Sequence, residues 1–199
     1  MTATARNTLP LLIVAVLGAA ACQPDSPAER PEGSQAEPAA GSAAGQVQAD
    51  HPGPQPGGSD VWSHLQDEDY RETWSLWPGR GELYEGKEPH GMLLTTYVND
   101  AALRAVENKA GRMPPGAMIV KENYTPEEEL ASVTVMYKAP GFNPDHNDWF
   151  FAKYLPDGSV AETPDGTPQA GRVPGCQACH AARKTNDYLF TGRIRAEGM

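Results

Sequence analysis

Apolar and polar residues alternate in short runs through the middle of the chain, and this pattern predicts strands. The runs are rich in Val, Ile, Thr and aromatic residues, and turn-forming residues separate them. Strands that follow one another this closely pair in antiparallel fashion. The expected strands are residues 92–98, 118–124, 132–138, 149–154 and, after a turn at 156–158, 159–161.

Two stretches show the spacing of an amphipathic helix instead. Tyr70, Trp74 and Trp77 recur at intervals of four and three residues, which predicts a helix that ends at the Pro-Gly pair after Trp77. A second helix is expected over residues 99–109, because Asn and Asp can cap its start and a glycine follows its end. Strands in succession with flanking helices predict an α+β domain, in which a small antiparallel β-sheet is packed with helices.

The first 21 residues indicate an export signal. Arg6 supplies a positive charge, the apolar run 9–17 is too short to span a bilayer, and three alanines precede Cys22. This arrangement resembles a lipoprotein signal, in which the cysteine is acylated, although alanine stands at 19 where leucine is usual. The alternative is ordinary cleavage before an unmodified Cys22. Both alternatives place the protein in the periplasm, and acylation would anchor it to a bacterial membrane, which we expect to be the outer membrane.

Residues 22–58 lack the apolar positions that a folded segment needs. After Cys22 they contain no aromatic residue, Ile, Leu or Met and a single valine. Such a segment cannot bury enough apolar surface to offset the entropy lost on ordering. We therefore expect a disordered tether with an r.m.s. span of roughly 30 Å, followed by a folded domain over residues 59–199.

The charge of the chain excludes one class of partner. Sixteen Lys and Arg stand against 26 Asp and Glu, for a formal net charge of −10. A form that starts at Cys22 loses Arg6 and carries 15 basic and 26 acidic residues, or −11. So acidic a protein repels phosphate backbones, and we expect it to bind no nucleic acid.

Five consecutive residues near the C-terminus, Cys176-Gln177-Ala178-Cys179-His180, form a C-x-x-C-H motif. Two thiols one helical turn apart can add across the two vinyl groups of a haem, and the next histidine is then positioned to bind the iron. A zinc site would need four ligands, and no second pair of Cys or His accompanies this one. A thioredoxin-like pair expects a βαβ setting, and a plain disulfide would leave His180 unexplained. We therefore expect one covalent haem c with His180 as iron ligand.

The position of the motif bears on the second axial ligand of the iron. Only 19 residues follow His180, and the one methionine among them is Met199. A methionine ligand would have to come from upstream, or the sixth position is open to water or a small molecule. An open position is typical of sensors and catalysts, whereas an electron carrier benefits from a closed coordination shell. The upstream candidates are Met92, Met113, Met118 and Met136.

The chain resembles the cytochrome P-460 family, periplasmic c-haem proteins first known as hydroxylamine oxidisers. The resemblance rests on the haem motif and four sequence blocks that appear in family order. It covers roughly residues 91–191 and leaves the tether and the Trp-rich segment outside. The blocks are residues 94–99 (LTTYVN), 115–122 (PGAMIVKE), 148–154 (DWFFAKY) and 186–191 (NDYLFT).

The resemblance implies a role for Lys121. This residue falls on the position of the family's lysine whose side-chain nitrogen bonds to a meso carbon of the haem. The related beta-type cytochromes c-prime share the fold without this bond, so Lys121 is a candidate for the cross-link. By strand alternation Lys121 shares a face with Ala117 and Ile119. The alternative is that its side chain snorkels to a strand end.

Aromatic side chains are further candidates for contact with the haem. Tyr97, Phe150 and Phe151 are the ones we expect at the cofactor, and ordinary core packing is the alternative for each. Phe150 must point away from the side of Trp149 and Phe151, so one side should line the haem cavity while the other packs under a helix. Among the remaining histidines, His90 is an alternative candidate for the distal face.

The resemblance implies a haem enzyme that oxidises hydroxylamine or a related small nitrogen compound and passes electrons to a separate cytochrome. One alternative is a haem protein that binds nitric oxide or carbon monoxide without turnover. Another is a periplasmic electron-transfer cytochrome, which would have a six-coordinate, low-spin iron. The resemblance also implies a homodimer.

Overall fold

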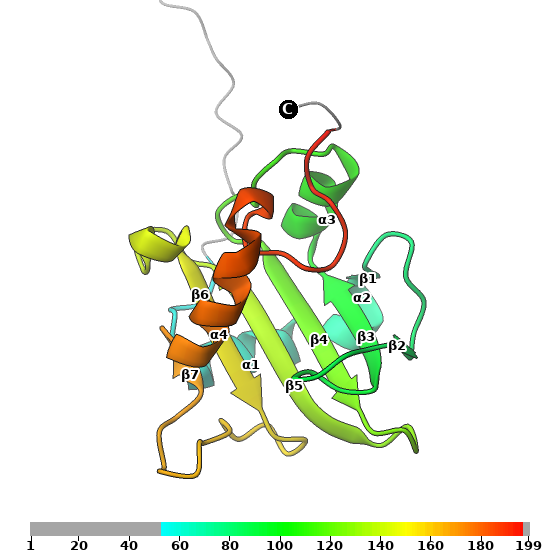
Figure 1. Ribbon diagram of the computed structural model, residues 1–199, viewed down its shortest axis with the longest axis vertical. Coiled ribbons are helices and arrows are strands. Elements are labelled where there is room, and N and C mark those ends of the chain that lie inside the picture. Colours follow the sequence, from blue (N-terminus) through cyan, green and yellow to red (C-terminus); the bar gives the residue numbers. More distant parts are fainter. Residues whose placement is uncertain (1–52, 197–199) are drawn as a thin grey trace, which may run out of the picture. The chain divides into compact units, whose positions relative to one another are not determined.

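The computed structural model describes residues 53–196, so the predicted signal, Cys22 and most of the predicted tether lie outside the described residues. Figure 1 shows a twisted sheet with helices on its faces. No helix of the described range is long and apolar enough to cross a membrane. The elements in chain order are α1 (Gly58–Asp67), α2 (Tyr70–Thr73), β1 (Ser75–Leu76), β2 (Tyr84–Glu85), β3 (Leu93–Val98), α3 (Asp100–Glu107), β4 (Met118–Tyr124), β5 (Leu130–Lys138), η1 (Pro144–His146), β6 (Trp149–Tyr154), β7 (Ala170–Gly171), α4 (Pro174–His180) and η2 (Ala181–Asn186).

The sheet is an antiparallel meander. Its strand order is β1-β3-β4-β5-β6-β7, and β2 pairs with β3 beside this path. In the long strands β4, β5 and β6, the residues Lys121, Thr134 and Lys153 lie in register. The predicted α+β class with a small antiparallel sheet is therefore confirmed. One expected strand is wrong, because residues 159–161 make only an isolated bridge to β6.

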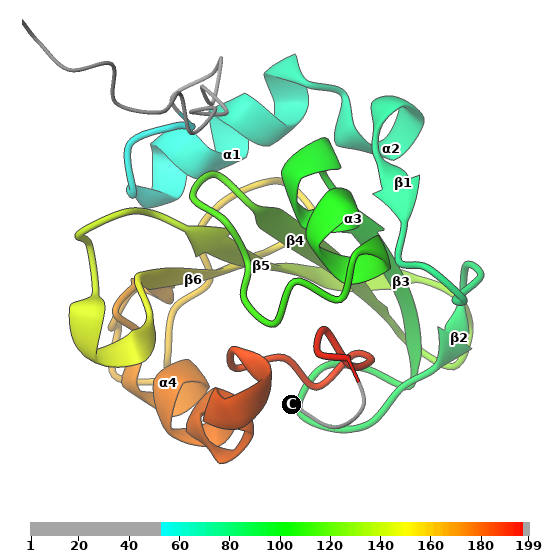
Figure 2. The ribbon, with the colours of Figure 1, turned by 90° about the horizontal axis from the view of Figure 1, so that it is seen from above.

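Strand alternation divides the apolar side chains into two cores, one on each face of the sheet. Helices α1 and α2 cover one face, while α3 and α4 cover the other, and Figure 2 shows α1 and α4 on opposite sides of the sheet. The core under α1 includes Val61, Leu65, Tyr70, Tyr97, Met118, Val120, Val135 and Phe150. The core under α3 and α4 includes Trp77, Val98, Val106, Met113, Ile119, Met136, Trp149, Phe151 and Leu189.

The helix expected from Tyr70 to Trp77 is wrong beyond its first turn. Only Tyr70–Thr73 is helical, and Trp74 is extended, with φ −90° and ψ 154°. The chain then enters β1, which pairs with the end of β3. Pairing with the edge of the sheet overrides the helical spacing and sends Tyr70 and Trp77 to opposite faces.

A longer helix, α1, precedes this turn, and the predicted elements did not include it. Val61 and Leu65 lie one turn apart and are fully buried against the sheet. Trp62 packs against Tyr154, with ring centres 4.8 Å apart, and also covers the turn at Gly158. The φ of Gly158 is +87°, and a Cβ atom there would overlap the indole. The predicted turn at 156–158 therefore depends on glycine both for its backbone and for its contact with α1.

Helix α3 is confirmed close to its predicted range. The side chain of Asn99 caps it, because its Oδ1 accepts hydrogen bonds from the backbone N of Ala102 and of Met118, each at 3.1 Å. The amide group of Asn99 donates to the carbonyl of Gly116 at 2.9 Å. One side chain thus joins the start of α3 to the start of β4.

Candidate functional site

The C-x-x-C-H motif forms most of helix α4. Pro174 stands in the first turn, where its missing N–H costs no hydrogen bond. Cys176 and Cys179 are free thiols one helical turn apart; Cys176 is partly buried and Cys179 is exposed. Burial raises the pKa of the Cys176 thiol. The helix therefore presents the two sulfur atoms on one side, as attachment to a single macrocycle requires.

His180, the last residue of α4, is buried and has a defined tautomer. Its Nδ1 lies 2.7 Å from the carbonyl oxygen of Tyr188, and a carbonyl can only accept, so Nδ1 carries the proton. The lone pair therefore resides on Nε2. The ring is flanked by Phe151 and Phe190, with ring centres 5.4 Å away in both cases. Burial lowers the pKa of His180. A neutral imidazole held through Nδ1 is the form in which histidine binds a metal.

The carbonyl that holds His180 is itself held in place by a buried ion pair. Asp187 and Tyr188 both adopt the left-handed conformation, with φ of +50° and +67°. The Asp187 carboxylate binds Nζ of Lys138 at 2.8 and 2.9 Å, and both side chains are almost fully buried. It also accepts from the backbone N of Met113 at 2.7 Å and from Asn147 at 2.9 Å. These contacts fix the bend that places the Tyr188 carbonyl against His180.

A cavity lies between α4 and the sheet. Its walls are largely apolar and come from the sheet face, the segment before β3, α4 and the residues after η2. Its enclosed volume is about 50 Å³, so exposed side chains at its mouth such as Phe190 must move aside to admit a haem. It is lined by Trp77, His90, Ile119, Lys121, Thr134, Val135, Met136, Phe151, Ala152, Cys176, His180, Leu189, Phe190 and Thr191.

Lys121 is the cavity's one lysine among the described residues. It lies in β4 between Thr96 of β3 and Thr134 of β5. Within the described range, no acceptor forms a hydrogen bond or ion pair with its Nζ. Burial, helped by the charge of Arg80, lowers the pKa of Lys121 to about 8. At pH 7 about a tenth of the side chains are then free amine, which is the nucleophilic form and is far scarcer for an ordinary lysine.

The aromatic candidates divide between the two faces. Phe151 lines the cavity beside His180, as one of the two sides of β6 was expected to do. Tyr97 and Phe150 lie on the opposite face, in the core beneath α1, and do not line the cavity. The reason is register, because side chains alternate along each strand and neighbouring positions in paired strands share a face.

The structure also places the four upstream methionines. Met136 alone of them lines the cavity. Met113 and Met118 are fully buried in the cores, and Met92 is exposed. Two further cavity residues, Trp77 and His90, come from the segment before β3. Neither residue shows a periodicity that predicts a position in the cavity. The spacing around Trp77 predicts a helix, and His90 is only an alternative candidate for the distal face.

The residues present fit a c-type haem. The Cys176 thiol, the Nε2 lone pair of His180 and the amine of Lys121 converge on one apolar cavity. Cysteine sulfurs would hold the macrocycle, the imidazole would hold the iron, and the apolar walls would exclude water. Among the described residues, no group of three or more His, Cys, Asp or Glu is arranged to hold a separate metal ion.

Comparison with known proteins agrees with this site. The family model described as Cytochrome P460 matches residues 68–191, which includes the sheet, the cavity and the C-x-x-C-H motif. The match begins upstream of the stretch on which the sequence resemblance rested, so it also includes α2 and β1. No curated protein matches the chain.

Proposed function

The chain belongs to the cytochrome P460 family of c-type haem cytochromes, and from this we propose that it is an exported mono-haem protein that oxidises hydroxylamine or a related small nitrogen compound. The observation that supports this most is the convergence of Cys176, His180 and Lys121 on one cavity. An ordinary c-type electron carrier has no use for the lysine. A cavity amine that has no acceptor among residues 53–196 has no evident structural purpose, and it suits the lysine–haem bond that the family resemblance implies.

The proposed covalent chemistry makes different demands on the cysteines and on Lys121. Each thiol of Cys176 and Cys179 adds its S–H across one vinyl group, and no atom is lost. The bond between Nζ of Lys121 and a meso carbon replaces one hydrogen on each atom, so a two-electron oxidant such as a peroxide must accept them. The free amine has the lone pair for this bond, and the lowered pKa of Lys121 makes that form available.

In catalysis the bound haem would supply an iron centre that accepts electrons from the substrate nitrogen. The chain's own residues bind and orient. His180 would hold the iron through Nε2, and the Tyr188 carbonyl fixes the orientation of its ring. Ile119, Met136 and Phe151 give the cavity apolar walls that suit a small, nearly neutral substrate. The same walls suit nitric oxide or carbon monoxide, which is why binding without turnover is the second candidate function.

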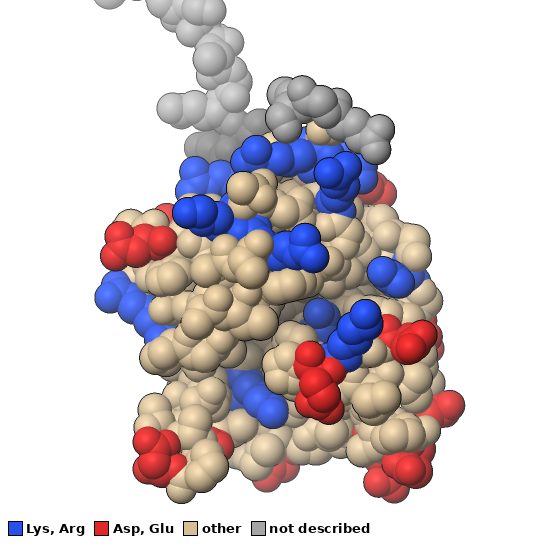
Figure 3. Space-filling view, viewed as in Figure 1, with Lys and Arg blue, Asp and Glu red and all other residues tan. Residues whose placement is uncertain are grey.

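The electrons would leave to a separate cytochrome, and the charge distribution suggests its character. Although the chain is acidic, Lys and Arg gather over η2 and the C-terminal segment, in the upper part of Figure 3. We call this region the C-terminal basic surface. Its members are all exposed: Arg112, Arg183, Lys184, Arg193 and Arg195. A partner with an acidic face would be attracted to it.

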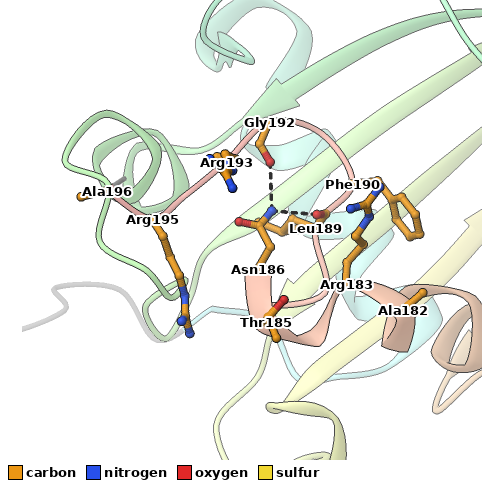
Figure 4. A pocket seen from close by; sticks show the side chains of 10 residues that line it. All are labelled: Ala182, Arg183, Thr185, Asn186, Leu189, Phe190, Gly192, Arg193, Arg195 and Ala196. Atoms are coloured by element: carbon orange, nitrogen blue, oxygen red, sulfur yellow. Dashed lines mark hydrogen bonds between the residues drawn. The ribbon is translucent and has the colours of Figure 1, made fainter. Parts of the chain in front are cut away.

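A pocket of about 520 Å³ opens on this surface. Figure 4 shows Asn186 at its floor, where the side-chain amide donates to the carbonyls of Leu189 at 2.8 Å and Gly192 at 2.9 Å. Phe190 lines both this pocket and the haem cavity. The guanidinium of Arg183 stands 5.1 Å from the centre of the Phe190 ring. The basic surface therefore adjoins the cavity, so an acidic electron acceptor docked there would lie near the haem.

Export, acylation of Cys22, attachment to the outer membrane and formation of a homodimer are further parts of the proposal. The first three rest on the N-terminal sequence, and the dimer rests on the family resemblance.

The test is the mass and spectrum of the protein matured with haem in a periplasm. The wild type should carry one haem and lack the two hydrogens displaced by the Lys121 bond, whereas Lys121→Ala should carry the haem with both hydrogens retained. Lys121→Arg keeps the charge and serves as the matched control. Hydroxylamine-dependent turnover with an artificial electron acceptor should be lost in both variants.

Three outcomes would decide against the proposal. Wild type and Lys121→Ala with the same count of hydrogens would exclude the cross-link. Stable nitrosyl formation without hydroxylamine turnover would favour the binding function. A mass without haem would remove the whole proposal.

A further inference from the structure

His90 is the second histidine of the cavity. It lies on the connection from β2 to β3, in a short loop. The two ends of this loop are joined by a hydrogen bond from Gly86 N to Met92 O at 2.8 Å. The backbone N of Met92 also donates to Tyr124 O in β4, which ties the loop to the sheet. The ring of His90 is partly buried and lines the cavity. The loop therefore presents this imidazole to the interior from a fixed base.

The ring of His90 lies close to the ring of His180 and perpendicular to it. Their centres are 6.2 Å apart and their planes are at 89°. Two imidazoles that bind one metal atom from opposite sides have ring centres about 6 Å apart, because each metal–nitrogen bond is about 2 Å and the nitrogen lies about 1 Å from the ring centre. The observed separation of the ring centres is close to that value and therefore suits one iron atom between the two rings.

The hydrogen bonds of His90 also prepare it as a ligand. Thr134 Oγ1 lies 3.4 Å from Nδ1 of His90, and the single hydroxyl proton of Thr134 is donated to the carbonyl of Lys121 at 3.3 Å. Towards His90 the hydroxyl can then only accept, which favours a proton on Nδ1 and a lone pair on Nε2. The side chain of Asn123 is the other hydrogen-bonding neighbour of the His90 ring. His180 has the same arrangement, with Tyr188 as acceptor. An acceptor on one ring nitrogen that frees the other is the usual setting of a metal-bound histidine.

We propose that His90 binds the haem iron opposite His180 in the resting protein and is displaced when a small ligand enters. The inference rests on the proposed haem site and refines it: the distal position is closed by a side chain until ligand binds. A partly buried ring on a loop can rotate away from the iron while the loop stays attached to the sheet. Among the methionines of the described range, only Met136 lines the same cavity, so it is the competing ligand.

The experiment compares ferric holoprotein by electron paramagnetic resonance and optical spectroscopy in the wild type, His90→Ala, Met136→Leu and His64→Ala. His64 lies on α1, outside the cavity, and is the matched histidine control. The wild type should be low-spin and six-coordinate. His90→Ala should lose the low-spin signal, and added imidazole should restore it. Met136→Leu and His64→Ala should keep the wild-type signal. Restoration by imidazole separates loss of a ligand from misfolding.

Two results would overturn the inference. The first is a high-spin wild type that His90→Ala leaves unchanged, and the second is loss of the low-spin signal in Met136→Leu but not in His90→Ala. Neither result touches the proposed function, which is judged by covalent mass and hydroxylamine turnover. Conversely, if a low-spin wild type becomes high-spin in His90→Ala, the inference about His90 holds even if hydroxylamine is not the substrate.

Discussion

Lys121 and Glu122 are neighbours in β4 that point to opposite faces of the sheet and have opposite surroundings. Glu122 is 1% exposed, and its carboxylate accepts from Tyr70 at 2.7 Å, from Arg71 at 2.6 Å and from Tyr124 at 2.6 Å. Lys121 has no comparable partner within the described range. The buried carboxylate is thus fully satisfied and serves structure, while the amine is left available for chemistry.

Glu122→Gln should destabilise the protein by roughly 1–3 kcal/mol, because an amide cannot accept all three donors and places an N–H group against one of them. Denaturant unfolding measures the loss. The haem spectrum should not change, since Glu122 lies on the face away from the cavity. Glu129→Gln, at an exposed position, is the control. A spectral change in Glu122→Gln with unaltered stability would contradict this assignment.

Tyr97 gives a prediction about alkaline pH. Burial, with the nearby charge of Glu122, raises the pKa of Tyr97 to about 12 from 10.0. Between pH 10 and 12 the unfolded chain releases this proton while the folded protein keeps it, so the free energy of unfolding must fall as pH rises. Tyr97→Phe should make that fall shallower and leave stability at pH 8 nearly unchanged. Denaturant midpoints at pH 8, 10, 11 and 12 test this; parallel curves for the two proteins would refute it.

At the scale of single residues, the sequence predicts the site residues whose chemistry requires a fixed spacing. It does not predict those whose place in the site depends only on which way the side chain points. The two cysteines and His180 are linked through one helix, so their convergence follows from the motif. Alternation shows that Phe150 and Phe151 point apart, but no local signal tells which of them meets the cofactor. That choice depends on which helix covers which face. His90 reaches the cavity through a loop whose path no periodicity encodes.

The segment from α4 to Thr191 functions as one element, held together by Asp187. Lys138→Met or Asp187→Asn alone should cost about 3–5 kcal/mol of folding stability, because each leaves a buried charge unpaired or a donor unsatisfied. Lys138→Met combined with Asp187→Asn should cost less than the sum. Because the Tyr188 carbonyl would shift, the single variants should also weaken the iron–His180 bond. The iron–histidine stretching frequency of the ferrous protein reports this, measured with His90→Ala present so that the iron is five-coordinate.

Arg104→Gln is the control for the double-mutant cycle of Lys138 and Asp187. Its partner Asp100 is exposed and 3.9 Å away, so this pair should contribute less than about 0.5 kcal/mol. An unchanged stretching frequency in all ion-pair variants would show that Asp187 stabilises the fold without positioning His180.

Helices and strands could be predicted from the sequence where the local hydrophobic pattern agreed with the pairing in the folded sheet. Strands β3 to β6 follow from alternation because each finds its neighbour in sequence. The stretch after Tyr70 has helical spacing, but β3 offers an unpaired edge to residues 75–76, and the hydrogen bonds of the sheet outweigh the local preference. Tertiary context of this kind cannot be seen in a window of ten residues.

At the scale of the whole molecule, the contrast between an acidic chain and one basic surface leads to a kinetic prediction. Electron transfer to an acidic c-type cytochrome should slow as ionic strength rises, and transfer to a basic one should not. Arg183→Glu and Arg195→Glu should lower the rate with the acidic acceptor at low salt. Arg104→Glu, on α3, is the control. Stopped-flow rates at several salt concentrations measure the effect, and equal salt dependence for the two acceptors would argue against docking at this surface.

The meander places every strand of the cavity wall before α4 along the chain. During synthesis β3 to β6 are therefore available first, and each pairs with the next of these strands along the chain, which favours early formation. The segment with both cysteines arrives afterwards, at a surface already built to receive it. Haem attachment would then be a late step of maturation. The haem would be joined to α4 while this segment is still accessible, and the segment would afterwards pack onto a sheet that has already formed.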